Sequence, residues 1–141
     1  MIGTGSAPWD QWPLALLGLV AAFWLFTLVG QVHLAAGTGW AVGLGYFGFA
    51  LGWIVEPFQV DAATTGWMAP FALFFLAGGL SLFWGLAFWM AAQVARAPVF
   101  ALVVFWSLAE LARGYVFTGF PWALVGYIWV SVDAIQWVAL V

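Results

Sequence analysis

The residues best suited to chemistry lie in one stretch, 107–122, where a carboxylate and a guanidinium stand three residues apart. At that spacing Glu110 and Arg113 share one face of a helix. Either charge buried alone in an apolar setting would cost a few kcal/mol, so a partner or a wet cavity is expected. Two interpretations follow. The pair is an intrahelical ion pair that makes both charges tolerable, or a polar patch that lines a cavity for a charged or amphiphilic ligand.

A turn with the sequence Gly119-Phe-Pro-Trp122 closes the helix that carries this pair. Glycine suits a left-handed position at a helix end, and Pro121 cannot continue a helix. As structure alone, this is a turn with an interfacial tryptophan. As a functional element, it is a rigid loop that holds the rings of Phe120 and Trp122 over the mouth of a lipid-facing cavity. The residues leave both interpretations open.

The remaining ionisable residues predict no second site. His33 is the sole histidine and the chain has no cysteine, so a metal site has nothing to build on. Glu56 and Asp61 flank Pro57 in an expected solvated loop, where nothing fixes them as an acid/base pair. No serine–histidine–aspartate set can be assembled, because the histidine lies on the far side from most of the acids. We expect no metal and no cofactor.

The composition places these residues in a membrane. Of the 141 residues, 67% are hydrophobic and 5% are charged, and the mean hydropathy is +1.13. A soluble domain of this size could not bury so much apolar surface, because its surface-to-volume ratio is too high. The chain contains two arginines and no lysine, and so few positive charges exclude nucleic-acid binding through phosphate neutralisation.

The apolar runs predict an all-α integral membrane protein, an incomplete bundle of about four to five transmembrane helices. A spanning helix needs about 20 mostly apolar residues. The whole chain is expected to form one N-terminal transmembrane domain, and its C-terminus, which falls within an apolar run, suggests a chain cut short. The expected spans are 13–36, 38–55, 67–92 and 98–118, followed by a partial segment at 123–141.

The second expected helix is rich in glycine. Gly39 and Gly43 form one GxxxG spacing, and Gly48 and Gly52 form another. Such spacings let helix backbones approach closely in lipid. We therefore expect this helix to pack tightly against a neighbour.

Alternation of the spans assigns the loops to two sides. Arg96 is the only loop residue that counts under the positive-inside rule, so the 93–97 loop is expected in the cytoplasm. The 56–67 and 119–122 loops then lie on the opposite side. The tryptophans at the expected helix ends fit an interfacial belt.

Several motifs together resemble one family. Glu110-Leu-Ala-Arg-Gly-Tyr-Val-Phe-Thr-Gly-Phe-Pro-Trp122, followed by Gly126-Tyr127, is similar to the E-x-x-R-G-x-x-x-x-G-F-P-W…GY signature of bacterial apolipoprotein N-acyltransferases. The turn Ala7-Pro-Trp-Asp-Gln-Trp-Pro13 and the glycine helix from Gly39 to Ile54 agree with that family in order and spacing. The resemblance covers essentially the whole chain.

The resemblance implies a place and a reaction. Members of this family lie in the bacterial inner membrane, with the 56–67 and 119–122 loops of this chain periplasmic. They transfer an acyl chain from a membrane phospholipid to the N-terminal cysteine amine of a diacylated lipoprotein. The reaction passes through a thioester in a periplasmic nitrilase-like domain with a Glu-Lys-Cys triad. Glu110 and Arg113 would organise the helix end beneath that site, Arg113 would be suited to a lipid phosphate, and Trp53, Phe120, Pro121 and Trp122 would line the lipid access.

The chain departs from the family in a way that matters for catalysis. It contains no cysteine and no lysine, so the triad must belong to a nitrilase-like domain, in cis or in trans, that this chain lacks. We expect the chain alone to be non-catalytic. Two alternatives remain. One is a small membrane transporter that uses Glu110, and the other is a non-catalytic anchor subunit for a separate nitrilase-like chain.

Overall fold

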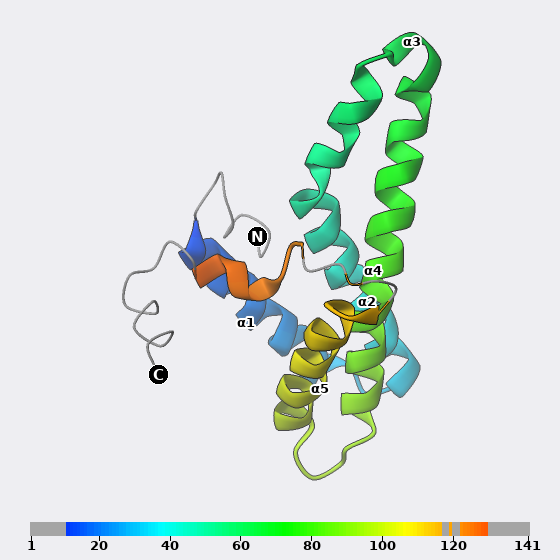
Figure 1. Cartoon of the computed structure of the whole chain (residues 1–141). Helices are drawn as coiled ribbons and strands as arrows, with labels where there is room; N and C mark the ends of the chain where they lie inside the picture. The colour runs from blue at the N-terminus through cyan, green and yellow to red at the C-terminus, as the bar shows by residue number, and fades with distance from the viewer. Residues whose placement is uncertain (1–10, 117–118, 120–121, 130–141) are drawn as a thin grey trace.

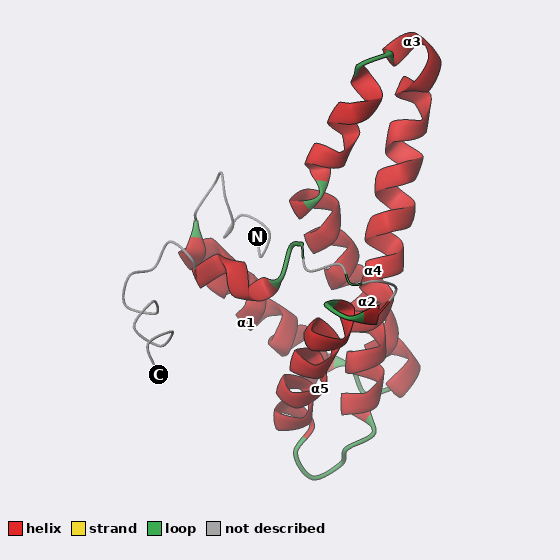
Figure 2. Cartoon of the chain, in the orientation of Figure 1, coloured by secondary structure: helices red, strands yellow, loops and turns green. Residues whose placement is uncertain are grey.

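A computed structural model describes residues 11–116, 119 and 122–129, and these residues form helices, turns and loops with no strand (Figure 2). The prediction of an all-α protein is confirmed for this part of the chain. The α-helices are α1 (Trp12–Leu28), α2 (Val32–Ala50), α3 (Ala62–Thr65), α4 (Ala69–Ala92) and α5 (Pro98–Arg113). The 3₁₀ helices are η2 (Gly52–Gln59), η3 (Gly66–Met68) and η5 (Val125–Trp129).

The pairing of α2 with α4 is the most extensive helix contact, and α5 packs on α4 beside it. Figure 1 shows η2 and the first half of α4 rising together as a hairpin with α3 at its tip, while α1 lies to one side of the bundle. The element η5 returns to lie near α1.

Glycine allows the close approach of α2 and α4, as the first GxxxG spacing predicts. A Cβ atom on Gly39 would fall 2.6 Å from the Phe88 ring, and one on Gly43 would fall 3.0 Å from Ser81. The indole N–H of Trp40 donates across the same interface to the Gly78 carbonyl at 3.1 Å. The second spacing does not serve this purpose, because a Cβ on Gly48 or Gly52 would meet nothing within 4 Å.

Several helix boundaries differ from the expected ones, and two of the differences have a clear local cause. The first helix ends at Leu28 rather than at residue 36, because the backbone is extended at Val29 and Gln31 around Gly30, a poor helix former. His33 consequently lies in the first turn of α2.

The second difference concerns Pro57, which was expected to end a helix and begin a solvated loop. Residues 52–59 instead form η2, with Pro57 inside it. The fixed φ of proline near −65° matches that of a 3₁₀ helix, which explains why the turn tolerates it.

The described helices support the expected membrane bundle only in part. One helical stretch, 62–92, is long and apolar enough to cross a membrane, and a second qualifies if α2 and η2, bent by 46°, count as one span. The helices α1 and α5 have 17 and 16 residues and are shorter than a usual span. The expectation of four to five full spans is therefore not met by helix length and composition among the described residues.

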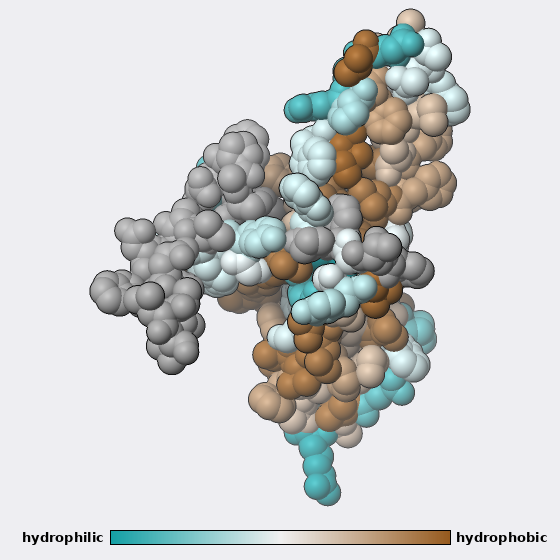
Figure 3. Space-filling view, in the orientation of Figure 1, coloured by the Kyte–Doolittle hydropathy of each residue, from teal (hydrophilic) through white to brown (hydrophobic). Residues whose placement is uncertain are grey.

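The outer surface is nevertheless strongly apolar. Large side chains such as Phe75, Phe100 and Val20 are mostly exposed. Figure 3 shows brown apolar groups over α4 and α5, with teal hydrophilic groups at the hairpin tip and at the opposite end of the molecule. Soluble monomers rarely expose contiguous apolar surface on this scale, so a lipid environment suits this face.

Candidate functional site

The ion pair predicted from spacing is present at the C-terminal end of α5. Arg113 Nη2 lies 3.0 Å from Glu110 Oε2. The Arg113 side chain is 1% exposed and the Glu110 side chain 16%. An ion pair this deeply buried needs further hydrogen bonds to offset the loss of hydration, and the surrounding groups provide them.

The guanidinium of Arg113 binds the backbone at residues 122 and 123. Its Nη1 donates to the Trp122 carbonyl at 2.7 Å, and its Nη2 donates to the Ala123 carbonyl at 3.0 Å. Its carbon lies 4.9 Å from the centre of the Phe47 ring, a cation–π distance. The guanidinium is thus enclosed by groups of this chain and fixes the position of residues 122–123.

The carboxylate of Glu110 connects three elements. Its Oε1 accepts a hydrogen bond from Trp84 Nε1 on α4 at 2.8 Å, and its Oε2 accepts one from the Val125 backbone N–H at 3.0 Å. The Tyr46 hydroxyl on α2 donates to the Ala123 carbonyl at 3.1 Å. We call this set the polar clasp: the side chains of Tyr46, Trp84, Glu110 and Arg113 with the backbone of 122–125.

Sequence reasoning found Glu110 and Arg113 but missed Tyr46 and Trp84. Both aromatic residues lie in apolar runs and look like ordinary core residues. In the structure their rings stack with centroids 5.0 Å apart, and both are almost fully buried. The sequence offered one chemical indication that Tyr46 and Trp84 belong to a polar network. A buried tyrosine or tryptophan carries a polar group that usually needs a partner.

The predicted left-handed conformation of Gly119 is confirmed, but its position in the fold differs from the expected one. Its φ is +83°, and a Cβ atom there would overlap the Gly114 carbonyl oxygen. The helix α5, however, already ends at Arg113, and its C-cap Gly114 keeps a right-handed φ of −68°. Gly119 therefore shapes the turn after the helix and does not cap the helix itself.

Two of the predicted aromatic residues lie together. The rings of Trp53 on η2 and Trp122 have centroids 6.0 Å apart, and the side chains are 49% and 59% exposed. The polar clasp holds the Trp122 backbone, so this exposed pair is anchored on one side. Phe120 and Pro121 fall outside the described residues.

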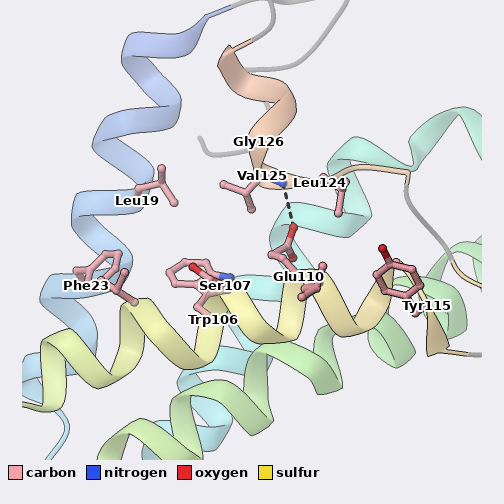
Figure 4. A pocket seen from close by; sticks show the side chains of 12 residues that line it. Leu19, Phe23, Trp106, Ser107, Glu110, Tyr115, Leu124, Val125 and Gly126 are labelled. Carbon is pink, nitrogen blue, oxygen red and sulfur yellow. Dashed lines mark hydrogen bonds between the residues drawn. The ribbon is translucent and has the colours of Figure 1, made fainter. Parts of the chain in front are cut away.

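A pocket of about 730 Å³ opens beside the clasp, between α1, α5 and the segment 124–126. Its walls are mainly apolar, and Glu110 and Ser107 on α5 contribute polar atoms. Figure 4 shows Glu110 directed toward Val125, with Leu19 and Phe23 of α1 on the side of the pocket opposite Leu124. Neither Trp53 nor Trp122 lines this pocket.

The outlying polar residues do not join this site. Glu56 lies in η2, and Asp61 precedes α3 without a side-chain capping hydrogen bond. Within residues 11–116, 119 and 122–129, no group of three or more His, Cys, Asp or Glu side chains is placed to hold a metal ion.

The described residues thus form an all-helical domain with an apolar outer surface and a buried ionic clasp at the end of α5. Comparison with known proteins makes the assignment specific. The family described as "Apolipoprotein N-acyltransferase N-terminal domain" matches residues 1–141. The chain belongs to the apolipoprotein N-acyltransferase family.

Individual relatives carry the same description. The apolipoprotein N-acyltransferase of Caulobacter vibrioides is 48% identical over 94 residues, which cover 64% of this chain and 18% of the relative. That of Rhodopseudomonas palustris is 37% identical over 128 residues, covering 85% of this chain and 24% of the relative. The matched regions thus span 18% and 24% of the length of these two relatives.

Proposed function

We propose that this chain is the membrane part of an apolipoprotein N-acyltransferase, which transfers an acyl chain from a phospholipid to the N-terminal cysteine amine of diacylated lipoproteins. Family membership over residues 1–141 supports the activity class. The polar clasp is the observation that supports a positioning role for this chain within the enzyme. A buried ion pair fixes residues 122–125 against the bundle, beside an exposed aromatic pair.

In this proposal the chain supports catalysis without performing it. It lacks a cysteine to form a thioester and a lysine to assist it. A nitrilase-like domain, in cis or in trans, supplies both. The helices hold that domain at the membrane of a bacterial cell, with the 56–67 and 119–122 loops periplasmic and the 93–97 loop cytoplasmic.

The candidate residues divide into two roles. Glu110 and Arg113 are positioning residues, since their charged atoms bind each other and the backbone of this chain. The burial of the Arg113 guanidinium favours this role over contact with a lipid phosphate. Trp53 and Trp122 form the lipid-facing side of the access path. We extend this role to Phe120 and Pro121, which precede Trp122 in the sequence and lie outside the described residues.

The carboxylate geometry disfavours the transporter alternative. A proton-coupled carrier needs a carboxylate that can exchange its partner. Glu110 already binds Arg113, Trp84 and Val125. Breaking such a buried pair would cost about 3–5 kcal/mol at each cycle.

The test is an acyl-transfer assay with a radiolabelled phospholipid and a diacylated lipopeptide. We expect transfer by the protein at its natural length and none by residues 1–141 alone. Transfer restored to residues 1–141 by a separately expressed nitrilase-like chain would identify the anchor-subunit arrangement. Turnover by residues 1–141 alone would overturn the supporting role. Absence of transfer both at natural length and with the separate nitrilase-like chain would overturn the proposed activity.

A further inference from the structure

The pocket beside the clasp is lined by polar atoms whose hydrogen-bonding capacity is not filled by the described residues. The Glu110 carboxylate has about four lone-pair positions. Among the described residues, Oε2 accepts from Arg113 and Val125, whereas Oε1 accepts only from Trp84. One acceptor position therefore remains on a carboxylate that lines the pocket.

A free hydroxyl accompanies this acceptor. Ser107 lies three residues before Glu110, on the same face of α5, and also lines the pocket. Its side chain is exposed and makes no hydrogen bond to any described residue. The pocket thus offers one hydrogen-bond acceptor and one hydroxyl that donates or accepts, a combination that suits an alcohol group.

The remaining walls of the pocket favour the apolar part of a ligand. Its walls include Leu19, Phe23, Val103, Leu111, Leu124 and Val125. The carboxylate that lines the pocket is already neutralised by Arg113, so the pocket itself selects the apolar chain and the hydroxyl of a ligand, and an ionic headgroup would lie outside it. Its volume of about 730 Å³ lies within the range of about 300–1,000 Å³ typical of small-molecule pockets.

We infer that this pocket binds a single-chain lipid with a free hydroxyl, the hydroxyl lying between Ser107 and Glu110 and the acyl chain running between α1 and α5. A lipid of this kind arises when a two-chain phospholipid gives up one acyl group, because cleavage of the ester leaves an alcohol on the glycerol. The role as a site for this deacylated product rests on the proposed function. The binding site itself rests on the geometry alone.

The test uses the protein at its natural length in lipid nanodiscs. The probe is a lysophosphatidylethanolamine with a photoactivatable diazirine in its acyl chain, and cross-linked peptides are identified by mass spectrometry. The competitors are unlabelled lysophosphatidylethanolamine and its O-methyl analogue, which differ only at the hydroxyl. We expect labelling of peptides containing Leu19 or Leu124 and about tenfold weaker competition by the methylated lipid, the loss typical of a hydrogen bond to a charged group.

Two matched variants locate the site. Val103→Trp places an indole in the pocket, whereas Val104→Trp changes a neighbouring exposed residue that does not line it. Val103→Trp should abolish the labelling, and Val104→Trp should leave it intact. Ser107→Ala should remove most of the preference for the free hydroxyl without touching the clasp.

Three results would overturn the inference: equal competition by the two lipids, equal labelling of the two tryptophan variants, or no labelling of the pocket peptides. The last result would also be the one expected if a further segment of the natural-length protein fills the pocket. Acyl transfer is measured on the same preparation. Hydroxyl-selective labelling without transfer retains the site and removes its role as a product site, whereas transfer without such labelling removes the site alone.

Discussion

Trp84 on α4 donates its indole N–H to the carboxylate of Glu110 on α5 across 2.8 Å. A residue in a long apolar run thus provides a hydrogen-bond donor to the family motif, which lies 26 residues further along the chain. The same indole packs edge-on against Trp106 with centroids 4.7 Å apart. Hydrogen bonding and aromatic packing therefore fix the orientation of α5 on α4 through one side chain. The motif residues act within a network to which α2, α4 and α5 each contribute.

Removing only the indole N–H tests this relationship. Trp84→Phe retains an aromatic ring and leaves Glu110 Oε1 without its donor. We expect a loss of about 1.5–3 kcal/mol in the free energy of unfolding, typical of a hydrogen bond to a charged group. Titration with a denaturing detergent measures the loss. Trp89→Phe, on an exposed position of the same helix, should change stability by less than about 0.5 kcal/mol. Equal effects of the two changes would contradict the assigned role.

Removing the cation leaves a buried carboxylate unpaired. Arg113→Ala should destabilise the protein by about 3–5 kcal/mol, because Glu110 then loses its counter-charge in an apolar setting. Arg96→Ala removes an exposed arginine and should have almost no effect. Hydrogen exchange at residues 122–125 should rise only in the Arg113 variant. Unchanged exchange there would mean that the clasp does not hold this segment.

Two glycines of α2 provide a matched pair for helix packing. Gly39→Ala would bring a methyl group within 2.7 Å of the Trp84 carbonyl oxygen, so α2 and α4 would have to separate. We expect a loss of at least about 2 kcal/mol. Gly37→Ala meets nothing within 4 Å and should be neutral, or stabilising by up to about 1 kcal/mol through helix propensity. Thermal unfolding of both variants measures the difference, and similar midpoints would contradict the packing argument.

The aromatic pair allows a test of function. If Trp53 and Trp122 act together on the acyl donor, replacing either with alanine should slow formation of the acyl-enzyme in the natural-length protein. The double variant should be less impaired than the two single effects combined, with a coupling of about 0.5–1.5 kcal/mol. Strictly additive effects on single-turnover rates would show that the two rings act independently.

Local patterns in the sequence predicted the local features well. The three-residue spacing predicted the Glu110–Arg113 contact, and Gly119 was expected in a left-handed conformation, because both depend on neighbours in the chain. The first GxxxG spacing likewise predicted the tight α2–α4 interface. Each of these predictions needed only helix geometry or the steric freedom of glycine.

Features that depend on distant contacts were not predictable in this way. Tyr46 and Trp84 reach the clasp because α2 and α4 pack beside α5, and no sequence period encodes that placement. The break at Val29–Gln31 was missed because it contains no proline and no charge, and the single polar residue Gln31 is too weak a signal to divide a long apolar run. The membrane role of α1 and α5 stays a prediction, since each is shorter than a usual span.

The eight residues of η2 affect the reach of the hairpin. A 3₁₀ helix rises about 2.0 Å per residue and an α-helix about 1.5 Å, so η2 covers about 16 Å where an α-helical segment of equal length would cover about 12 Å. The element works as a spacer that carries α3 further from the clasp without additional residues. Deleting one residue between Trp53 and Gln59 would draw the tip in by about 2 Å and rotate it by about 120° relative to α2.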